Sequence, residues 1–245
     1  MGLGKKAFEH IATTLRALED DAEVLCLGEQ DIYFDENWLR ETVAEMGREL
    51  PEGWQAEVSP KKYFQRQGFL TQRCVFESIG FKRSFSLDLS SFEGCDFIHD
   101  LNDPQPPEEL CGRFGLIIDG GTLEHVFHVP NALTAIHRML KTGGIIAHHS
   151  PTNNYVDHGF FSFSPTFFAD YYQHAGYEFG EHWLVAHLPD GADQRAVVIE
   201  HQPGDTDLVG RLDYRMYATL FWAKKRAESL PQGHPNQGFY RKAWD

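Results

Sequence analysis

The sequence predicts a doubly wound α/β fold with a mainly parallel sheet. Short apolar runs alternate with stretches of helical periodicity, which is the pattern of βαβ units. The apolar runs lack the polar alternation of a half-exposed strand, so we expect helices to cover both faces of the sheet. No low-complexity linker divides the 245 residues, and this length suits one large domain. We therefore expect a single domain over residues 1–245.

The N-terminal third is predicted to hold a helix, a strand and a helical insertion. Apolar residues recur at helical spacing through residues 5–19, and residues 23–28 form a short apolar run that ends in glycine. The segment 31–80 is too long for one crossover between strands. Two stretches within it, 37–50 and 63–79, have helical character. Because about 50 residues is thin for an independent core, we interpret 31–80 as an insertion after the first strand.

The rest of the chain repeats the pattern of strand and helix. Helices are expected at 131–140, which ends in a cation followed by glycines, and at 164–175, which begins with Ser-Pro. A tail rich in Pro, Gly and Gln is expected over 227–245. The predicted strands are 84–88, 96–100, 114–119, 145–150, 183–188 and 216–222.

The charge and the cysteines exclude several classes of function. Lys and Arg number 22 and Asp and Glu 36, which gives a formal net charge of −14. A field of that sign repels phosphate backbones and anionic lipid surfaces, so we expect neither a nucleic-acid nor a membrane partner. No apolar run reaches the roughly 18 residues of a membrane span, and the N-terminal segment lacks the apolar stretch of a signal peptide. The cysteines have no paired spacing, so free thiols and a cytoplasmic location are expected: Cys26, Cys74, Cys95 and Cys111.

Polar and glycine residues stand where the predicted strands end. In an open parallel sheet, ligands bind beyond the carboxyl ends of the strands. Carboxylates at these ends accept hydrogen bonds from hydroxyl and amine groups of a ligand, and they repel a phosphate. Aspartates at strand ends also cap the turns that follow, so each one taken alone has two interpretations. The strand-end residues are Gly28-Glu29-Gln30, Asp88, Asp100, Asp119-Gly120-Gly121 and Ser150-Pro-Thr-Asn-Asn154.

Three segments resemble the class I S-adenosylmethionine-dependent methyltransferases. They are Gly-Leu-Ile-Ile-Asp-Gly-Gly-Thr-Leu-Glu-His-Val at 115–126, His-Arg-Met-Leu-Lys-Thr-Gly-Gly at 137–144, and Ser-Pro-Thr-Phe-Phe at 164–168 with Ala-Gly-Tyr at 175–177. The resemblance covers about residues 20–180. It implies a seven-stranded Rossmann-like sheet and S-adenosyl-L-methionine as the cofactor.

The resemblance also implies where the cofactor would lie. Asp88 would take the ribose hydroxyls and Asp100 the adenine amine, while Gly120 and Gly121 would let the backbone pass the sulfonium. The first loop departs from the family's Gly-x-Gly-x-Gly because it has one glycine. A carboxylate in that loop either pairs with the methionine ammonium or repels its carboxylate, and both alternatives stay open. The other expected cofactor-binding residues are Gly28, Glu29, Gln30, Leu101 and Thr122.

Two histidines are candidates for catalysis. His158 lies in a polar loop beyond the fifth strand, and imidazole is a suitable base because its unperturbed pKa is about 6.5. His125 is expected at the start of a helix under the site. The alternatives are a solvated loop histidine at His158 and a structural hydrogen bond at His125. Together with His128 and Asp157 they offer metal-ligand types, but without HExxH or a comparable spacing no metal is expected.

The sequence therefore predicts a methyltransferase with a small-molecule acceptor. The insertion and the loop 151–163 are expected to build the acceptor pocket. The aromatic run 160–172 either packs in the core or forms a substrate wall, and Lys61, Lys62, Arg66 and Arg73 either meet an anionic acceptor or line a solvated face. O-methyl transfer to a sugar, a nucleotide-sugar or a secondary metabolite is the expected reaction. The alternative is a scaffold subunit that kept the fold and lost the cofactor through its one-glycine loop.

Overall fold

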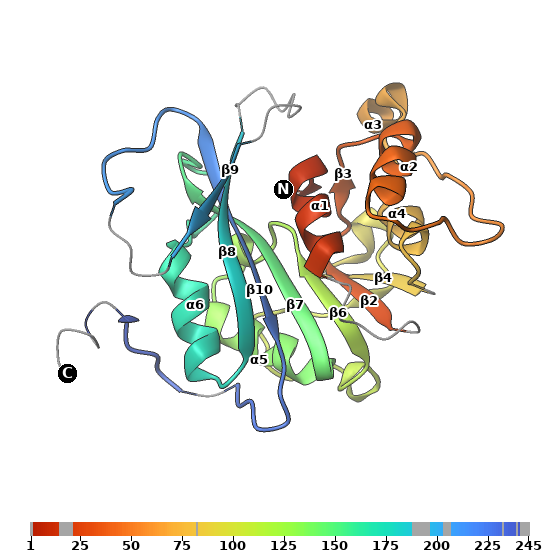
Figure 1. The fold of residues 1–245 in the computed structure, drawn as a ribbon. Helices are drawn as coiled ribbons and strands as arrows, with labels where there is room; N and C mark the ends of the chain where they lie inside the picture. The colour runs from red at the N-terminus through yellow and green to blue at the C-terminus, as the bar shows by residue number, and fades with distance from the viewer. Residues whose placement is uncertain are drawn as a thin grey trace.

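The computed structural model describes residues 2–14, 22–81, 83–187, 197–202, 207–231, 233–238 and 240. Within these residues an eight-stranded mixed sheet, ordered β5-β4-β2-β6-β7-β10-β8-β9, forms the centre of the molecule (Figure 1). Its first five strands are parallel, and β10 is antiparallel to both of its neighbours. The strands are β2 (Glu23–Leu27), β4 (Arg83–Asp88), β5 (Phe97–Ile98), β6 (Phe114–Asp119), β7 (Leu140–Asn153), β8 (Glu178–His187), β9 (Val197–His201) and β10 (Met216–Lys224).

Helices cover both faces of the sheet, as the sequence predicts for a doubly wound fold. A separate pair, β1 (Gly2–Leu3) and β3 (Asp31–Ile32), lies beside the first helix. The helices are α1 (Lys5–Thr14), α2 (Glu36–Glu45), α3 (Lys62–Gln67), α4 (Gln72–Ser78), α5 (Val129–Met139) and α6 (Pro165–His174). None of the described helices is long and apolar enough to span a membrane.

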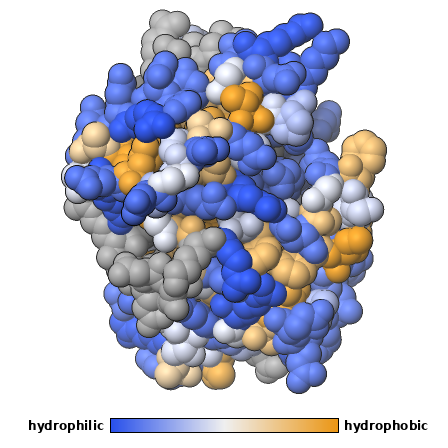
Figure 2. Space-filling view, turned by 90° about the vertical axis from the view of Figure 1, so that its right-hand side faces the viewer, coloured by the Kyte–Doolittle hydropathy of each residue, from blue (hydrophilic) through white to orange (hydrophobic). Residues whose placement is uncertain are grey.

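Alternate residues of each central strand face opposite cores. In β2, Leu25 and Leu27 pack on the layer that contains α5 and α6, while Val24 and Cys26 pack on the layer that contains α1, α2 and α4. Both faces of the strand are therefore apolar, which explains the continuous apolar runs in the sequence. On the side of α2–α4 the outer surface is largely hydrophilic, with scattered hydrophobic patches (Figure 2).

The structure differs from the sequence prediction in several elements. The sheet has eight strands in the described chain where seven were predicted, because β9 pairs antiparallel with the outer side of β8. The helix predicted over 63–79 is two helices, since Gly68 adopts the left-handed conformation (φ +68°) and Phe69 and Leu70 form β-bridges. The helix predicted over 37–50 ends at Glu45.

Some predicted segments fall partly outside the described residues. These are residues 15–19 of the first predicted helix, residue 188 of the predicted strand 183–188, and residues 232, 239 and 241–245 of the tail.

The order of the strands predicts where a ligand crevice lies in this sheet. The chain runs outward from β2 to β4 and β5 and then returns to the other side of β2 to form β6 and β7. The carboxyl ends of β2 and β6 therefore lie at the point where the direction of winding reverses. Crevices at this point are the usual ligand sites of open α/β sheets.

Candidate functional site

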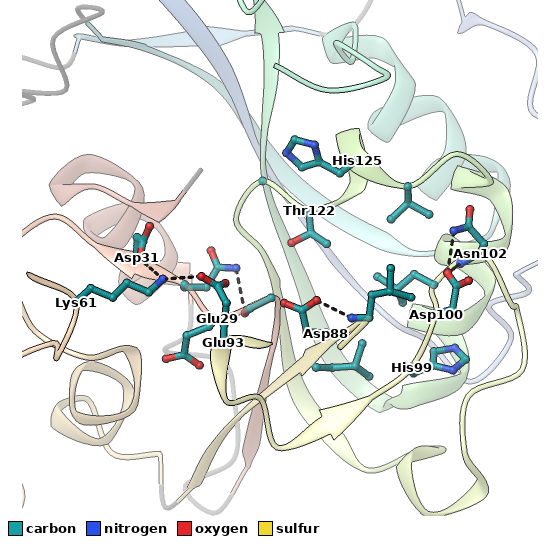
Figure 3. A pocket seen from close by; sticks show the side chains of 17 residues that line it. Glu29, Asp31, Lys61, Asp88, Glu93, His99, Asp100, Asn102, Thr122 and His125 are labelled. Atoms are coloured by element: carbon teal, nitrogen blue, oxygen red, sulfur yellow. Dashed lines mark hydrogen bonds and ion pairs between the residues drawn. The ribbon is translucent and has the colours of Figure 1, made fainter. Parts of the chain in front are cut away.

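A pocket of about 430 Å³ opens at the carboxyl ends of β2, β4, β5 and β6 (Figure 3). This volume lies within the range of small-molecule and cofactor sites. Of the cofactor-binding residues that the sequence predicts, all except Gly120 line the pocket. Those residues are Gly28, Glu29, Gln30, Asp88, Asp100, Leu101, Gly121 and Thr122.

Hydrogen bonds tie the loops after β2 and β6 together. Gly28 has φ +75°, and its N–H donates to the carbonyl of Leu87 at 2.7 Å. The Thr122 hydroxyl donates to the carbonyl of Leu27. A Cβ at position 28 would lie 3.3 Å from the Thr122 hydroxyl in a conformation that side chains rarely adopt. The single glycine of the first loop therefore stands where the backbone requires one.

The Gln30 side chain packs between the loops after β2 and β6. Its side chain is buried, and its Nε2 donates to the carbonyl of Leu27 at 2.7 Å. A Cβ at Gly120 would lie 1.9 Å from the Gln30 Oε1, so Gly120 makes room for Gln30 and does not line the pocket. Gly121, with φ +100°, is the glycine of this pair that faces the pocket.

Asp88 and Asp100 each use one carboxylate oxygen to hold the following turn. The Asp88 Oδ1 accepts from the N–H of Leu89 at 2.6 Å. The Asp100 Oδ1 accepts from the N–H and the side-chain amide of Asn102 at 2.9 and 2.8 Å, which lowers the pKa of Asp100. The second oxygen of each carboxylate has no hydrogen-bond partner among the described residues. The structure therefore confirms that these acids cap turns, and a ligand-binding role for the second oxygen stays a prediction.

Negative charge exceeds positive charge around the pocket. Lys61 is the one lysine or arginine among the lining residues, and its ammonium pairs with Asp31 at 2.8 Å and with Glu93 at 3.1 Å. Burial raises the pKa of Glu29, with Ser86 and Lys61 acting in the opposite direction. The carboxylates that line the pocket are Glu29, Asp31, Asp88, Glu93 and Asp100. Such a lining suits a ligand with positive charge.

A buried polar network holds the loop after β6. Asp119 accepts from the N–H groups of Thr122 and Leu123 at 2.9 and 3.2 Å through one oxygen. Its other oxygen contacts the His148 Nδ1 at 2.8 Å and the Ser150 hydroxyl at 3.1 Å. Burial acts to raise the pKa of Asp119, but the hydrogen bond and charge of His148 outweigh it and the pKa is lowered. The network fixes the backbone that carries Thr122 into the pocket.

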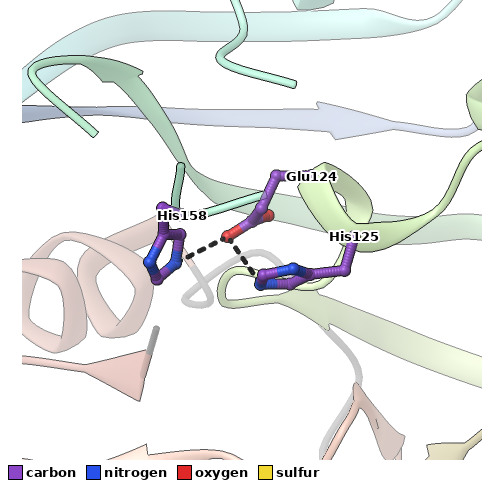
Figure 4. A group of neighbouring side chains, drawn as sticks. All are labelled: Glu124, His125 and His158. Carbon is purple, nitrogen blue, oxygen red and sulfur yellow. Dashed lines mark ion pairs between the residues drawn. The ribbon is translucent and has the colours of Figure 1, made fainter. Parts of the chain in front are cut away.

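Glu124, His125 and His158 form a cluster beside the pocket (Figure 4). The Glu124 Oε1 lies 3.6 Å from the His158 Nε2 and 3.9 Å from the His125 Nε2. Glu124 is 0% exposed, and neither of its carboxylate oxygens has a hydrogen-bond partner in the described structure. Burial raises its pKa to about 8, to which the charge of Asp119 adds. Burial lowers the pKa values of both histidines.

The cluster joins the two histidines that the sequence singled out. Of the three residues, His125 lines the pocket, and Glu124 and His158 lie beside it without lining it. His128 and Asp157 are not members of the group. Sequence reasoning missed Glu124 as a site residue. A signal for it was present, since Glu124 is the direct neighbour of His125 in the Leu-Glu-His-Val segment that carries the resemblance.

The aromatic run separates into core and surface residues. Phe163, Phe168 and Tyr172 are buried in the layer of α5 and α6. Phe160 is exposed, and its ring meets the exposed ring of Phe127 edge-to-face at 5.7 Å. These two rings lie in the same loops as His158 and His125. The core interpretation is therefore confirmed for the buried residues of the run, and a substrate wall at the exposed ones stays a prediction.

The insertion and the loop 151–163 contribute to two different cavities. Lys61, from the insertion, lines the first pocket, and Arg73 pairs with Asp96. Thr152 and Ser162 line a second cavity of about 720 Å³ at the end of β7. In the described structure the insertion and this loop therefore line different cavities, and the acceptor pocket stays a prediction.

Known structures share this fold at low sequence identity. No family model matches the chain, and no curated protein matches it in sequence. The YcgJ protein from Bacillus subtilis is 13% identical with a TM-score of 0.50, over 90% of this chain and 98% of that one. The 1,6-didemethyltoxoflavin-N1-methyltransferase from Burkholderia thailandensis, solved with 1,6-didemethyltoxoflavin and S-adenosylhomocysteine, is 14% identical with a TM-score of 0.44, over 91% and 77%. A SAM-dependent methyltransferase from Archaeoglobus fulgidus is 12% identical with a TM-score of 0.43, over 89% and 94%. The likeness to the YcgJ protein shows a shared fold over most of both chains.

Proposed function

We propose that this protein is an S-adenosylmethionine-dependent methyltransferase that acts on a small-molecule acceptor. The observation that carries the proposal is the pocket at the switch point of the sheet, where two strand-end aspartates each keep one carboxylate oxygen without a partner among the described residues. When bound, S-adenosylmethionine supplies a methyl group on a positively charged sulfur.

The pocket offers suitable groups to an adenosine. Asp88 is the proposed acceptor for the ribose hydroxyls and Asp100 the proposed acceptor for the adenine amine, as the resemblance implies. Leu87, Leu101 and Val126 supply apolar walls between and beside these acids. An aromatic base between apolar walls, with its amine on a carboxylate, satisfies both its apolar and its polar atoms.

The opposite end of the pocket suits the charged amino-acid part. Lys61 is the proposed partner of the cofactor carboxylate, because it is the one cationic lysine or arginine among the lining residues. Glu29 is the proposed partner of the ammonium group. The excess of carboxylates favours the sulfonium over the neutral thioether that remains after transfer, by ordinary charge attraction.

The acceptor is proposed to bind against His125, His158 and the exposed rings of Phe127 and Phe160. These rings offer a flat apolar surface to a sugar or an aromatic body. One of these histidines is the proposed base: its neutral imidazole accepts the proton of the nucleophile as the methyl group arrives. A hydroxyl of a sugar, a nucleotide-sugar or a secondary metabolite is the proposed group that is methylated.

The competing function is a scaffold subunit that does not bind the cofactor. The observation in its favour is Gln30, which occupies space next to the first loop and packs against Gly120. Gln30 lines only one side of the pocket, and the volume that remains is that of a small-molecule site. Ligand binding therefore distinguishes the two functions.

Calorimetric titration with S-adenosylhomocysteine and S-adenosylmethionine tests the proposal. We expect both to bind at one site, and a ligand at 100 times its Kd stabilises the fold by about 2.7 kcal/mol in a thermal-shift experiment. ATP is the matched control, because it shares the adenosine and carries phosphates that the carboxylate-rich pocket repels. No binding of either ligand at millimolar concentration, or equal binding of ATP, contradicts the proposal.

A further inference from the structure

The cluster of Glu124, His125 and His158 has the composition of a metal site. Its three ligand atoms, one carboxylate oxygen and two imidazole nitrogens, all lie within 4.8 Å of one another. We propose that these three residues bind a divalent first-row transition ion such as Zn²⁺ at the edge of the pocket.

The chemistry of the donors supports this class of ion. Two histidines and one glutamate form a ligand set of catalytic zinc sites, which keep a further position open for water or substrate. The same set with nitrogen and oxygen donors also accepts other first-row ions. Hard cations such as Mg²⁺ and Ca²⁺ prefer sites made of oxygen alone.

The buried carboxylate is an independent indication of a missing partner. Glu124 is 0% exposed and is aimed at both imidazoles, yet neither of its oxygens has a hydrogen-bond partner among the residues that the structure describes. Buried polar groups in proteins are nearly always satisfied, because leaving one unpaired is costly. A cation between the three side chains satisfies this carboxylate.

The backbone brings the two halves of the cluster together. The N–H of Phe160 donates to the carbonyl of Glu124 at 2.7 Å, which fixes the loop that carries His158 against the segment 123–125. Gly159 allows this approach, because a Cβ there would lie 2.7 Å from the Glu124 carbonyl oxygen. The close contact between the two loops is therefore built into the sequence.

The ligand spacing requires only side-chain movement. Bonds of 2.0–2.1 Å in a tetrahedral site place ligand atoms about 3.3 Å apart. The Glu124 Oε1 is 3.6 Å from His158 and 3.9 Å from His125. The two histidine side chains are 35% and 49% exposed, so their rings have room to close on an ion while Glu124 stays fixed.

The consequence for the reaction rests on the proposed function. An ion held by these three residues would act as a Lewis acid on an acceptor hydroxyl and would make loss of the hydroxyl proton to water easier. The oxygen then forms a bond to the methyl carbon, the carbon–sulfur bond breaks, and its electron pair stays on sulfur. In this arrangement His158 is a ligand, and the ion replaces the free base that the sequence suggested.

Metal titration of the tag-free, EDTA-treated full chain tests the site. We expect one equivalent of Co²⁺ to bind with visible absorption bands of a nitrogen–oxygen site, and one equivalent of Zn²⁺ to displace it. His158→Ala and Glu124→Gln should each weaken Co²⁺ binding by at least about 100-fold, more than the usual effect of an outer partner of a metal ligand. His128→Ala is the matched control, because His128 is an exposed neighbour outside the cluster, and its affinity should equal that of the wild type.

Two results overturn the proposal: no stoichiometric binding in the wild type, or equal affinities in His158→Ala and His128→Ala. Circular dichroism checks the fold of each variant. If Glu124→Gln does not fold, His125→Ala takes its place, since His125 is half-exposed. Titration of the metal-free protein with S-adenosylhomocysteine separates the two proposals. Cofactor binding without metal binding overturns only the metal site, and metal binding without cofactor binding overturns only the proposed function.

Discussion

At the scale of single residues, capping a turn and binding a ligand are compatible roles for one aspartate. Asp88 and Asp100 each hold the next turn with Oδ1, and Oδ2 has no partner in the described structure. The hydrogen bond to the turn fixes the side chain, so its second oxygen is presented to the pocket in one orientation. A preorganised acceptor loses less entropy when a ligand binds.

Asp88→Ala should weaken S-adenosylhomocysteine binding by about 1.5–3 kcal/mol, the usual loss for a hydrogen bond to a charged group. Calorimetry measures the change. Asp103→Ala is the matched control, because Asp103 caps a nearby turn through Gln105 but does not line the pocket. Unchanged affinity in a folded Asp88→Ala variant would remove Asp88 from the proposed ribose site.

His158→Ala should lower turnover by about 10²–10⁴ on any acceptor that the wild type methylates, the range for loss of proton-transfer or nucleophile-activating groups. Its affinity for S-adenosylhomocysteine should stay near that of the wild type, because His158 is not among the residues that line the pocket. Single-turnover kinetics and calorimetry separate the two effects. Normal turnover would mean that positioning alone drives the transfer.

At the scale of elements, the sequence predicts best where burial decides the structure. The strand predicted over 114–119 matches β6, and Ser164-Pro165 begins α6 as predicted. These segments follow from apolar runs and from capping residues, which are local signals. The helix predicted over 63–79 was wrong because Gly68 ends α3 and the next residues pair with Asp35 and Val58, which are distant in sequence.

The loop after β6 depends on a buried charge, which makes it sensitive to acid. The pKa of Asp119 is lowered in the folded protein, so its contribution to stability is complete above the unfolded value of about 3.9 and disappears as the pH falls through the folded pKa. Asp119→Asn should lower the free energy of unfolding by about 3 kcal/mol at pH 7, because it disrupts a buried pair.

Urea unfolding at pH 7, 5 and 3.5 measures this prediction. The difference between Asp119→Asn and the wild type should shrink at the lowest pH. Ser150→Ala is the control, because it removes one hydrogen bond to the same oxygen and leaves the charge, at a cost of about 1 kcal/mol. An equal difference at all three pH values would contradict an ionised Asp119 in the folded protein.

At the scale of the whole molecule, the site depends on residues that are far apart in the sequence. The strand ends were predictable because parallel strands share one edge. The pairing of Lys61 with Asp31 and Glu93, the burial of Glu124 under the loop of His158, and the packing of Gln30 on Gly120 were not. Each requires the relative placement of two loops, and local periodicity carries no information about it.

Buried histidines should make the whole fold less stable as the pH falls. Burial lowers the pKa values of His149 and His182 to about 3, so both stay neutral in the folded protein while the unfolded chain takes up protons below about 6.5. The stability that these neutral histidines contribute to the fold is therefore complete above about pH 6.5 and decreases as the pH falls towards 3. Each adds at most about 1.4 kcal/mol per pH unit to the slope.

Between pH 6 and 4, His182→Gln should reduce the slope of the unfolding free energy against pH by up to about 1.4 kcal/mol per pH unit, which corresponds to the uptake of one proton. Denaturant unfolding across this range measures the slope. Thr219→Val is the matched control, because it removes the hydrogen bond to His182 and leaves the titrating group. It should lower stability and keep the slope, and an unchanged slope in His182→Gln would contradict a neutral buried imidazole.

The central claim is that the pocket at the switch point of the sheet binds S-adenosylmethionine, and a crystal structure of the complex with S-adenosylhomocysteine tests it most directly. We expect the ligand in the pocket between Gly28, Asp88 and Gly121, with the ribose hydroxyls on Asp88 and the amine of the adenine on Asp100. Ligand density at another place, or none in crystals grown at saturating ligand, would contradict the claim.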